Sequence, residues 1–236
     1  LHTISRRQRQ MCIRDSSMAK EFEDSYNDGP IEGIVITRYG HSTKTKFIEV
    51  VEASHPEPDK IGLIASKKLF DLAKKADEDD HVIFLISGGA SSLLTLPADG
   101  INFEEKQRIN KELLISGAPI DQMNIVRRAL SKIKGGRLAE AIYPAKLSTY
   151  MISDIPGDDP SYIGSGPTIQ ANGSNNDAFK ILNDYNIDIS ENLKEIIIKN
   201  QLPKILNSPT YMLANPMMAL KSAYDEAAKF GYKPII

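Results

Sequence analysis

Residues 82–92 read VIFLISGGASS, and this stretch decides the fold class of the chain. The unbroken apolar run from Val82 to Ile86 is typical of a strand buried on both faces of a parallel sheet. A polar turn follows at once and marks the carboxyl end of that strand. In open α/β sheets, ligands bind beyond the carboxyl ends of the strands. The stretch therefore predicts both a parallel sheet and the edge of it at which a ligand binds.

Apolar, β-branched runs alternate with segments of helical period on both sides of this stretch. We expect further strands over 31–36, 46–51, 147–152 and 210–214, and the start of one over 233–236. We expect helices over 59–76, 103–116, 121–141, 176–185, 191–199 and 216–230. Asn102 is the expected N-cap of the second helix, and Gly135-Gly136 is expected to interrupt the third. This β-α-β alternation predicts an α/β fold with a doubly wound, mostly parallel sheet flanked by helices.

Composition and charge exclude several classes of protein. The chain has 236 residues, 41% hydrophobic and 25% charged, which suits one large α/β domain or two small ones. A net charge of -2 argues against nucleic acid or an anionic membrane as the main partner. No apolar run approaches the roughly 20 residues that span a bilayer. The single cysteine, Cys12, excludes an intramolecular disulfide and indicates a reducing, cytoplasmic setting.

The first 17 residues differ from everything after them. They contain four arginines against one acid, Asp15, and show no clean apolar period. Arg-rich, acid-poor starts also occur in organelle transit peptides, but no clear amphipathic helix accompanies this one. We expect a non-native leader, such as vector or adapter sequence translated in frame, or a disordered segment. The fold is therefore assigned to residues 18–236, as an incomplete N-terminal α/β domain.

The turn after the 82–86 strand is a candidate anion cradle. Glycines let backbone N–H groups approach an oxyanion closely, and serine hydroxyls add donors. The candidate phosphate-binding residues are Ser87, Gly88, Gly89, Ala90, Ser91 and Ser92. The alternative is a tight strand-to-helix turn that binds nothing. The turn matches neither the Walker A motif nor G-x-G-x-x-G.

A second polar loop, SDIPGDDP at 153–160, follows the 147–152 strand. Its three aspartates suit a hard cation, because Mg²⁺ takes one or two carboxylates plus substrate phosphates. We assign Asp158 and Asp159 to the metal and Asp154 to catalysis, although aspartates are also common in plain turns. Ser165, Gly166 and Thr168 follow shortly and could add backbone donors, or form a turn without function.

Cations next to Gly135-Gly136 are candidates for neutralising a transferring phosphate. We favour Lys134 and Arg137 as catalytic residues. The alternative is a solvated helix face. His41 and His55 also follow predicted strands, and either could touch a ligand, although loop histidines more often have structural partners.

Several of these motifs coincide, in order, with those of one known family. They are TRYGH at 37–41, EASHPEPD at 52–59, LISGGASSLL at 85–94, LISGA at 114–118, NIVRRALSKIKGGRLA at 124–139, ISDIPGDDPSYIGSGPT at 152–168 and the region of Asn215. Across residues 18–236 the chain resembles the type-2 glycerate kinases, whose N-terminal domain precedes a smaller C-terminal domain.

The resemblance implies phosphoryl transfer from ATP, with Mg²⁺, to a hydroxyl of D-glycerate, giving 2-phosphoglycerate or 3-phosphoglycerate. It also implies a Rossmann-like domain that faces a second domain across the active-site cleft. By motif, residues 87–92 would line that cleft, Lys134 and Arg137 would lie near phosphate or the substrate carboxylate, and the three aspartates would hold metal or a substrate hydroxyl.

Two departures from the family pattern affect the expected activity. Family members carry a lysine in a Gly-Lys-Ala segment that falls here near Ile13, where no lysine is present. The family's second domain, with a further active-site arginine, is expected to be missing from this chain. We therefore expect little or no kinase activity from the 236 residues alone, and the chain could form a homodimer.

Two other functions stay open. Some family members have been named hydroxypyruvate reductases, but no G-x-G-x-x-G with a downstream acid is visible for a dinucleotide. The second is a non-catalytic α/β domain that binds a nucleotide or sugar acid without turning it over.

Overall fold

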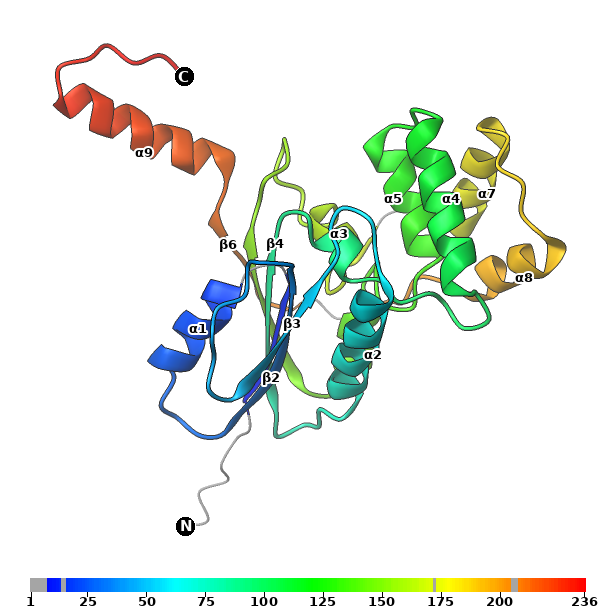
Figure 1. The fold of residues 1–236 in the computed structure, drawn as a ribbon, viewed down its shortest axis with the longest axis horizontal. Coiled ribbons are helices and arrows are strands. Elements are labelled where there is room, and N and C mark those ends of the chain that lie inside the picture. Colours follow the sequence, from blue (N-terminus) through cyan, green and yellow to red (C-terminus); the bar gives the residue numbers. More distant parts are fainter. Residues whose placement is uncertain (1–7, 14–15, 172, 205–207) are drawn as a thin grey trace.

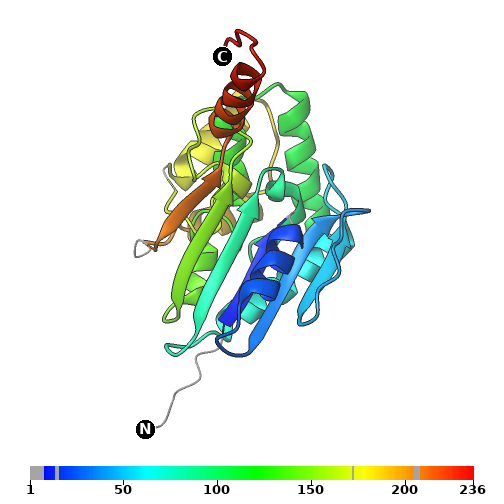
Figure 2. The same ribbon diagram turned by 90° about the vertical axis from the view of Figure 1, so that its left-hand side faces the viewer.

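A computed structural model describes residues 8–13, 16–171, 173–204 and 208–236. Its centre is a six-stranded sheet in the order β3-β2-β1-β4-β5-β6, and all neighbouring strands are parallel (Figures 1 and 2). The strands are β1 (Gln8–Ile13), β2 (Ile31–Arg38), β3 (Ile48–Ala53), β4 (His81–Ser87), β5 (Lys146–Ile152) and β6 (Thr210–Ala214). The predicted α/β fold with a doubly wound parallel sheet is confirmed. Strands β2 and β3 are added on one side of β1, and strands β4 to β6 on the other, so the carboxyl ends of β1 and β4 lie at the topological switch point.

Helices cover both faces of the sheet. Helix α1 (Ser16–Ser25) packs on one face, against β1, β2 and β3. Helices α2 (Lys60–Lys74) and α6 (Arg137–Ile142) pack on the other, and Figure 1 shows α1 and α2 on opposite sides. The interior of β4 is buried throughout, as its apolar run predicts. Phe84 and Ile86 of β4 belong to the main core under α2.

Residues 1–17 were expected to lie outside the fold, and strand β1 shows that part of this segment belongs to the sheet. Residues 8–13 of that segment form a central strand, paired with both β2 and β4. The buried Arg9 is tolerated because its guanidinium forms ion pairs with Asp80 (2.7 Å) and Glu32 (2.8 Å). Residues 1–7, 14 and 15 lie outside the described residues. Whether the segment is native stays a separate prediction, but 18–236 does not contain the whole sheet.

A second group of helices stands beside the sheet with a hydrophobic core of its own, which the sequence did not predict. It contains α4 (Phe103–Ile115), α5 (Ile120–Ala129), α7 (Asn175–Asp184) and α8 (Glu191–Lys199) (Figure 1). We call it the helical cluster. Two of its helices follow β4 and two follow β5, so it rises from the carboxyl edge of the sheet. It can therefore form one wall of a cleft at that edge.

Helix boundaries agree with the predicted signals. Asn102 caps α4, and its side chain accepts a hydrogen bond from the Glu105 amide (2.6 Å). The predicted helix over 121–141 is split into α5 and α6, because Gly135 and Gly136 both adopt positive φ. Two short turns, α3 (Ala90–Leu93) and the 3₁₀ turn η1 (Ile163–Ser165), follow β4 and β5.

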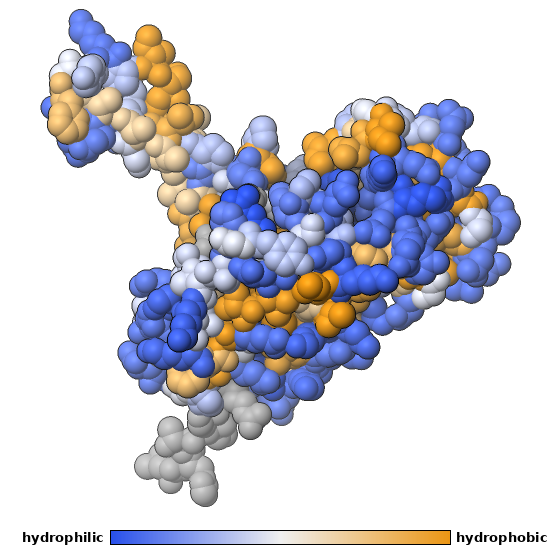
Figure 3. Space-filling model, in the orientation of Figure 1, coloured by the Kyte–Doolittle hydropathy of each residue, from blue (hydrophilic) through white to orange (hydrophobic). Residues whose placement is uncertain are grey.

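Helix α9 (Pro216–Lys229) follows β6 and projects away from the sheet, and none of its residues is buried (Figure 1). Figure 3 shows apolar atoms exposed along it. The predicted strand over 233–236 is wrong, because the chain leaves α9 at a distance from the sheet and meets no strand edge there. No helix in the described ranges is both long enough and apolar enough to cross a membrane.

Candidate active site

The glycine–serine turn after β4 meets the aspartate loop after β5. A Cβ atom added to Gly88 would lie 1.8 Å from Cγ of Asp154, so only glycine allows this approach. Gly89 adopts a φ of 75° and begins the α3 turn. The two loops therefore meet at one edge of the sheet. Ala90 of the same turn belongs to the main core instead of the surface of the site.

The buried side chain of Lys134 holds the glycine–serine turn in place. This side chain is 2% exposed, and Nζ donates to the carbonyl oxygen (2.6 Å) and hydroxyl (2.7 Å) of Ser91. A longer contact reaches the carbonyl of Gly164 (3.5 Å). The Ser91 hydroxyl also pairs with that of Ser165 (3.0 Å). The structure therefore brings Lys134, Ser91 and Ser165, which the sequence identified separately as candidates, into contact with one another.

Burial lowers the pKa of Lys134 well below its ordinary value. The nearby charges of Lys106, Arg127 and Arg128 lower this pKa further. An ammonium surrounded by other cations is stabilised by an added anion, so the electrostatics at Lys134 favour an anionic ligand.

Arg137, a predicted catalytic residue, does not line the site with Lys134 and is bound to backbone carbonyls instead. Its Nη1 donates to the carbonyl oxygens of Arg128 (3.0 Å) and Lys134 (2.9 Å). Its Nη2 donates to the carbonyls of Asn200 and Gln201 (3.3 Å for the latter). Burial lowers the pKa of the guanidinium to about 10. These bonds join the end of α8 to the loop before α6, which is a structural role.

The aspartate loop is tied to the start of α9. Asp158 has a φ of 53°, and its Oδ2 accepts a hydrogen bond from the side-chain amide of Asn215 (2.8 Å). The other carboxylate oxygen of Asp158 is buried and has no hydrogen-bond partner among the described residues. Asp159 instead accepts from the Ser161 amide (2.8 Å), which is a turn contact.

These carboxylates fit Mg²⁺ bound largely by phosphates. Within the described ranges, no three His, Cys, Asp or Glu side chains are grouped so that they could hold a metal ion by themselves. A magnesium ion that keeps one or two protein carboxylates needs no such group. The orphaned, buried Oδ1 of Asp158 is the observation that fits a cation there.

Two predicted phosphate ligands lie away from the site. The Thr168 side chain is 1% exposed and accepts a hydrogen bond from the Thr149 hydroxyl (2.9 Å) beneath the loops. Gly166 accepts from the Gly136 amide (2.8 Å) through its carbonyl. Both hold the η1 region against the glycine pair, so the structure gives them a supporting position. Ser87 ends β4 and is also buried.

A cavity of about 310 Å³ opens beside the glycine–serine turn, between the sheet edge and the helical cluster. We call it the cationic cavity. It is lined by His55, Pro56, Glu57, Pro58, Gly89, Ser91, Ser92, Thr95, Lys106, Gln107, Asn110, Lys111, Leu114, Arg127 and Lys134. Four of these residues carry cations and only Glu57 is acidic. The cavity therefore suits an anionic ligand.

The cavity residues that the sequence did not identify include Asn110, Arg127 and Lys106, of which Lys106 is the most deeply buried. Lys106 lies on α4, is 2% exposed, and its ammonium has no hydrogen-bond partner among the described residues. Burial lowers its pKa to about 7. A signal was present: Phe103, Lys106, Ile109 and Leu113 share the buried face of α4, so a lysine occupies a position of apolar period.

Arg127 of α5 and Asn110 of α4 complete the wall formed by the helical cluster. Burial lowers the pKa of Arg127, and no carboxylate counteracts it. Gln107 donates to the carbonyl of Pro58 (2.6 Å), which fixes the 55–58 turn against α4. His55, considered as a ligand contact from the sequence, lines the cavity, whereas His41 does not.

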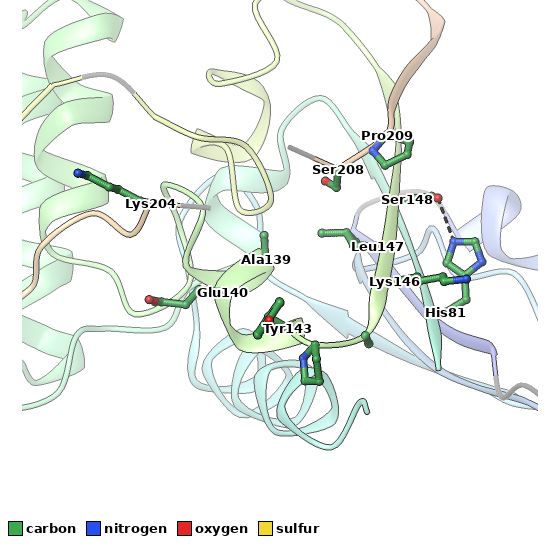
Figure 4. Close-up of a pocket in the computed structure, with 12 residues that line it drawn as sticks. His81, Ala139, Glu140, Tyr143, Lys146, Leu147, Ser148, Lys204, Ser208 and Pro209 are labelled. Atoms are coloured by element: carbon green, nitrogen blue, oxygen red, sulfur yellow. Dashed lines mark hydrogen bonds between the residues drawn. The ribbon is translucent and has the colours of Figure 1, made fainter. Parts of the chain in front are cut away.

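A larger cavity of about 620 Å³ lies at the opposite edge of the sheet (Figure 4). It is bounded by the first residues of β4 and β5, His81 and Lys146, and His81 forms a hydrogen bond with Ser148 (2.9 Å). Ligand sites of open α/β sheets lie beyond the carboxyl ends of the strands, not the amino ends. We therefore place the site in the smaller, cationic cavity.

The chain is similar in sequence to one family model and to several named proteins. The family model described as "Domain of unknown function (DUF4147)" matches residues 15–198. A protein of Agrobacterium vitis with the provisional name hydroxypyruvate reductase is 41% identical, over 94% of this chain and 58% of its own. The D-glycerate 2-kinase of Thermotoga maritima is 37% identical, over 85% of this chain and 48% of its own.

The crystal structure of a glycerate kinase from Thermotoga maritima has the same fold, with a TM-score of 0.90 and 34% sequence identity. The match covers 97% of this chain and 56% of that one. The chain thus spans about half the length of the relatives it matches. These matches confirm the resemblance to glycerate kinases that the motifs predict.

Proposed function

This chain belongs to the DUF4147 family, and on that premise we propose that the whole protein transfers a phosphoryl group from ATP to a hydroxyl of D-glycerate. The product is 2-phosphoglycerate or its 3-phospho isomer. The proposal draws on the names of the relatives for the substrate, and on the cavity of this chain for the chemistry.

The observation that carries the proposal is a set of basic side chains, two of them buried and one half-buried, with no acidic partner among the described residues. Lys106, Arg127 and Lys134 line one cavity, and burial lowers the pKa of each. Unpaired buried charges cost free energy in the empty protein, and an anionic ligand recovers that free energy on binding. Both substrates of the proposed reaction are anions.

The two sides of the site suit different parts of the reaction. The Asp154 and Asp158 side supports Mg²⁺, which would neutralise charge on the phosphates when bound. The cationic side suits the carboxylate of D-glycerate. Between them lies the glycine–serine turn, of which Gly89, Ser91 and Ser92 line the cavity. Catalysis of phosphoryl transfer depends mainly on such positioning and charge neutralisation.

Lys134 is a positioning residue in this scheme. Its ammonium is already bound to Ser91 and Gly164, so it holds the turn in shape and adds positive potential. Lys134 lines the cavity while its ammonium keeps these hydrogen bonds. Arg137 has no part in the reaction beyond supporting the loop that carries Lys134.

A coupled assay tests the proposed function. The whole protein with D-glycerate, ATP and Mg²⁺ should produce ADP in proportion to phosphoglycerate. The 236-residue chain should bind both substrates but turn over little or not at all. Absence of ADP formation by the whole protein would contradict the proposal, whereas near-normal turnover by the chain would contradict only the expected inactivity of the chain.

The reductase is the second candidate, because one relative at 41% identity carries that name. NADH with hydroxypyruvate, without ATP, separates the two reactions. Oxidation of NADH by the whole protein, with no ADP formed from D-glycerate and ATP, would establish the reductase instead. Binding of both substrates by the whole protein without any product would favour the non-catalytic binding domain.

A further inference from the structure

One wall of the cationic cavity is formed by the helical cluster. The aspartates of the 153–160 loop do not line this cavity. Lys106 and Asn110 lie one turn apart on α4, and Arg127 faces the same cavity from α5. The site is therefore divided into a side that carries acids and a side that carries cations.

Two buried polar atoms on this wall lack partners among the described residues. One is a donor, the ammonium of Lys106, and the other is an acceptor, the amide oxygen of Asn110. Buried polar atoms in folded proteins are nearly always satisfied, so an exception in a cavity wall points to a ligand that satisfies it. The ligand must offer an anion to Lys106 and a hydrogen-bond donor to Asn110.

We propose that Lys106, Asn110 and Arg127 form the subsite that binds the carboxylate end of a hydroxy-acid substrate directly, without a metal ion. In this arrangement Lys106 and Arg127 bind the carboxylate, and Asn110 accepts a hydrogen bond from an adjacent hydroxyl. The inference rests on the proposed function for the choice of D-glycerate, but its geometry belongs to this cavity alone.

The distribution of charge favours a carboxylate over a metal-bound phosphate on this wall. Phosphates of a nucleotide are accompanied by Mg²⁺, which needs carboxylate ligands. Among the described residues that line the cavity, Glu57 is the single acid, and it is an exposed residue of the 55–58 turn. A planar carboxylate also matches the fork of the Arg127 guanidinium. The triphosphate with its metal therefore belongs on the aspartate side.

Binding at this subsite should take up a proton. The pKa of Lys106 is about 7 without a ligand, and a carboxylate beside it raises that pKa. The charged and titratable groups that face the cavity with Lys106 are Lys111 on α4, Arg127 on α5, Lys134 on the loop before α6, and His55 and Glu57 on the turn after β3. D-glycerate should accordingly bind more weakly as the pH rises above 7.

Isothermal titration of the 236-residue chain tests the subsite. The probes are D-glycerate, glycerol (which lacks the carboxylate) and inorganic phosphate. Lys106→Met should weaken D-glycerate binding by about tenfold or more, because a charged hydrogen bond is lost. Lys67→Met, on the exposed face of α2, is the matched control and should bind like the wild type. Glycerol should not bind measurably.

Thermal unfolding gives a readout that a merely structural lysine would not produce. Lys106→Met should raise the unfolding midpoint, because it removes a buried, unpaired ammonium and keeps the side-chain length. When a residue serves binding at the expense of stability, its replacement weakens binding and stabilises the protein. A lowered midpoint with unchanged D-glycerate binding would overturn the proposal.

The remaining outcomes separate the subsite from the proposed function. Equal binding of D-glycerate by wild type and Lys106→Met overturns the subsite, even if the whole protein phosphorylates D-glycerate. Binding of phosphate, but not of any hydroxy acid, through Lys106 also overturns it. Lys106-dependent binding of lactate with no binding of D-glycerate supports the subsite and contradicts the proposed function.

Discussion

At the scale of single residues, the site depends on two residues in unusual surroundings, Gly88 and Lys106. Gly88 is a glycine because Asp154 occupies the space that a side chain would need. Lys106 is a lysine at a position where the period of α4 calls for an apolar residue. The first could be predicted from the sequence as a tight turn, since glycine pairs after buried strands indicate one. The second could be predicted only by treating a charge within an apolar face as a signal.

Lys106→Met should change stability in a pH-dependent way. The pKa of Lys106 is about 7 in the folded chain, against an ordinary value of 10.5. Between these values the unfolded chain binds a proton that the folded chain does not, so the stability of the wild type rises with pH across this window. The variant should be more stable than the wild type by a few kcal/mol at and below pH 7, and the gap should narrow towards pH 10.

Urea unfolding of both proteins at a series of pH values measures this gap. Lys67→Met serves as the control and should differ from the wild type by the same amount at every pH. A gap for Lys106→Met that stays constant or widens between pH 7 and 10 would show that the folded protein holds this lysine charged throughout.

Gly88→Ala should damage the meeting of the two loops. The added methyl group overlaps the Asp154 carboxylate, and relief of such overpacking costs about 1–3 kcal/mol. Gly40→Ala is a useful comparison, because nothing lies within 4 Å of its added Cβ and only its positive φ, 74°, opposes the change. That strain costs about 1–2 kcal/mol.

Titration with ATP and Mg²⁺ distinguishes the two glycine variants. Gly88→Ala should weaken binding of the metal–nucleotide, because Asp154 must move, whereas Gly40→Ala should leave it unchanged. Undiminished binding by Gly88→Ala would separate Asp154 from the metal.

At the scale of elements, the N-cap residues of α4 and α9 differ in the contacts that they make outside their own helix. Asn102 caps α4, and among the described residues its side chain forms a hydrogen bond with the Glu105 amide alone. Asn215 caps α9 through the Met218 amide (2.7 Å) and also donates to Asp158. One residue therefore joins the end of β6, the start of α9 and the aspartate loop.

Asn215→Ala and Asn102→Ala form a matched pair. Each should cost about 1 kcal/mol of stability through the lost cap, measured by thermal unfolding. Only Asn215→Ala should also weaken the binding of ATP with Mg²⁺, because Asp158 loses the partner that orients it. Equal effects of both variants on nucleotide binding would show that Asp158 needs no orientation by Asn215.

The elements also show how far the sequence predicts the fold. Strands β2 to β6 follow from apolar runs, and the helix caps and the glycine break follow from local signals. Strand β1 could not be found in this way, because Gln8 and Arg9 give its first half a polar sequence and a distant acid, Asp80, compensates the arginine. The helical cluster could not be found either, since amphipathic period says which face of a helix is buried but not against what.

At the scale of the whole molecule, the site exists because the chain leaves the sheet twice to build the helical cluster. The insertions after β4 and β5 pack together around their own core, beside the carboxyl edge of the sheet. The loops that the sequence identified supply the sheet side of the cleft. The opposite wall, with Lys106 and Arg127, comes from tertiary packing that no local pattern specifies. This is why the aspartate and glycine loops were predicted and the cationic wall was not.

We expect both substrates to bind in the cleft between the sheet edge and the helical cluster. A crystal structure of the 236-residue chain with D-glycerate, ATP and Mg²⁺ tests it most directly. We expect the D-glycerate carboxylate within hydrogen-bonding distance of Lys106 Nζ, and the nucleotide phosphates on the side of Gly88 and Asp158. D-glycerate bound in the cavity beside His81 and Lys146, with Lys106 still without a partner, would contradict it.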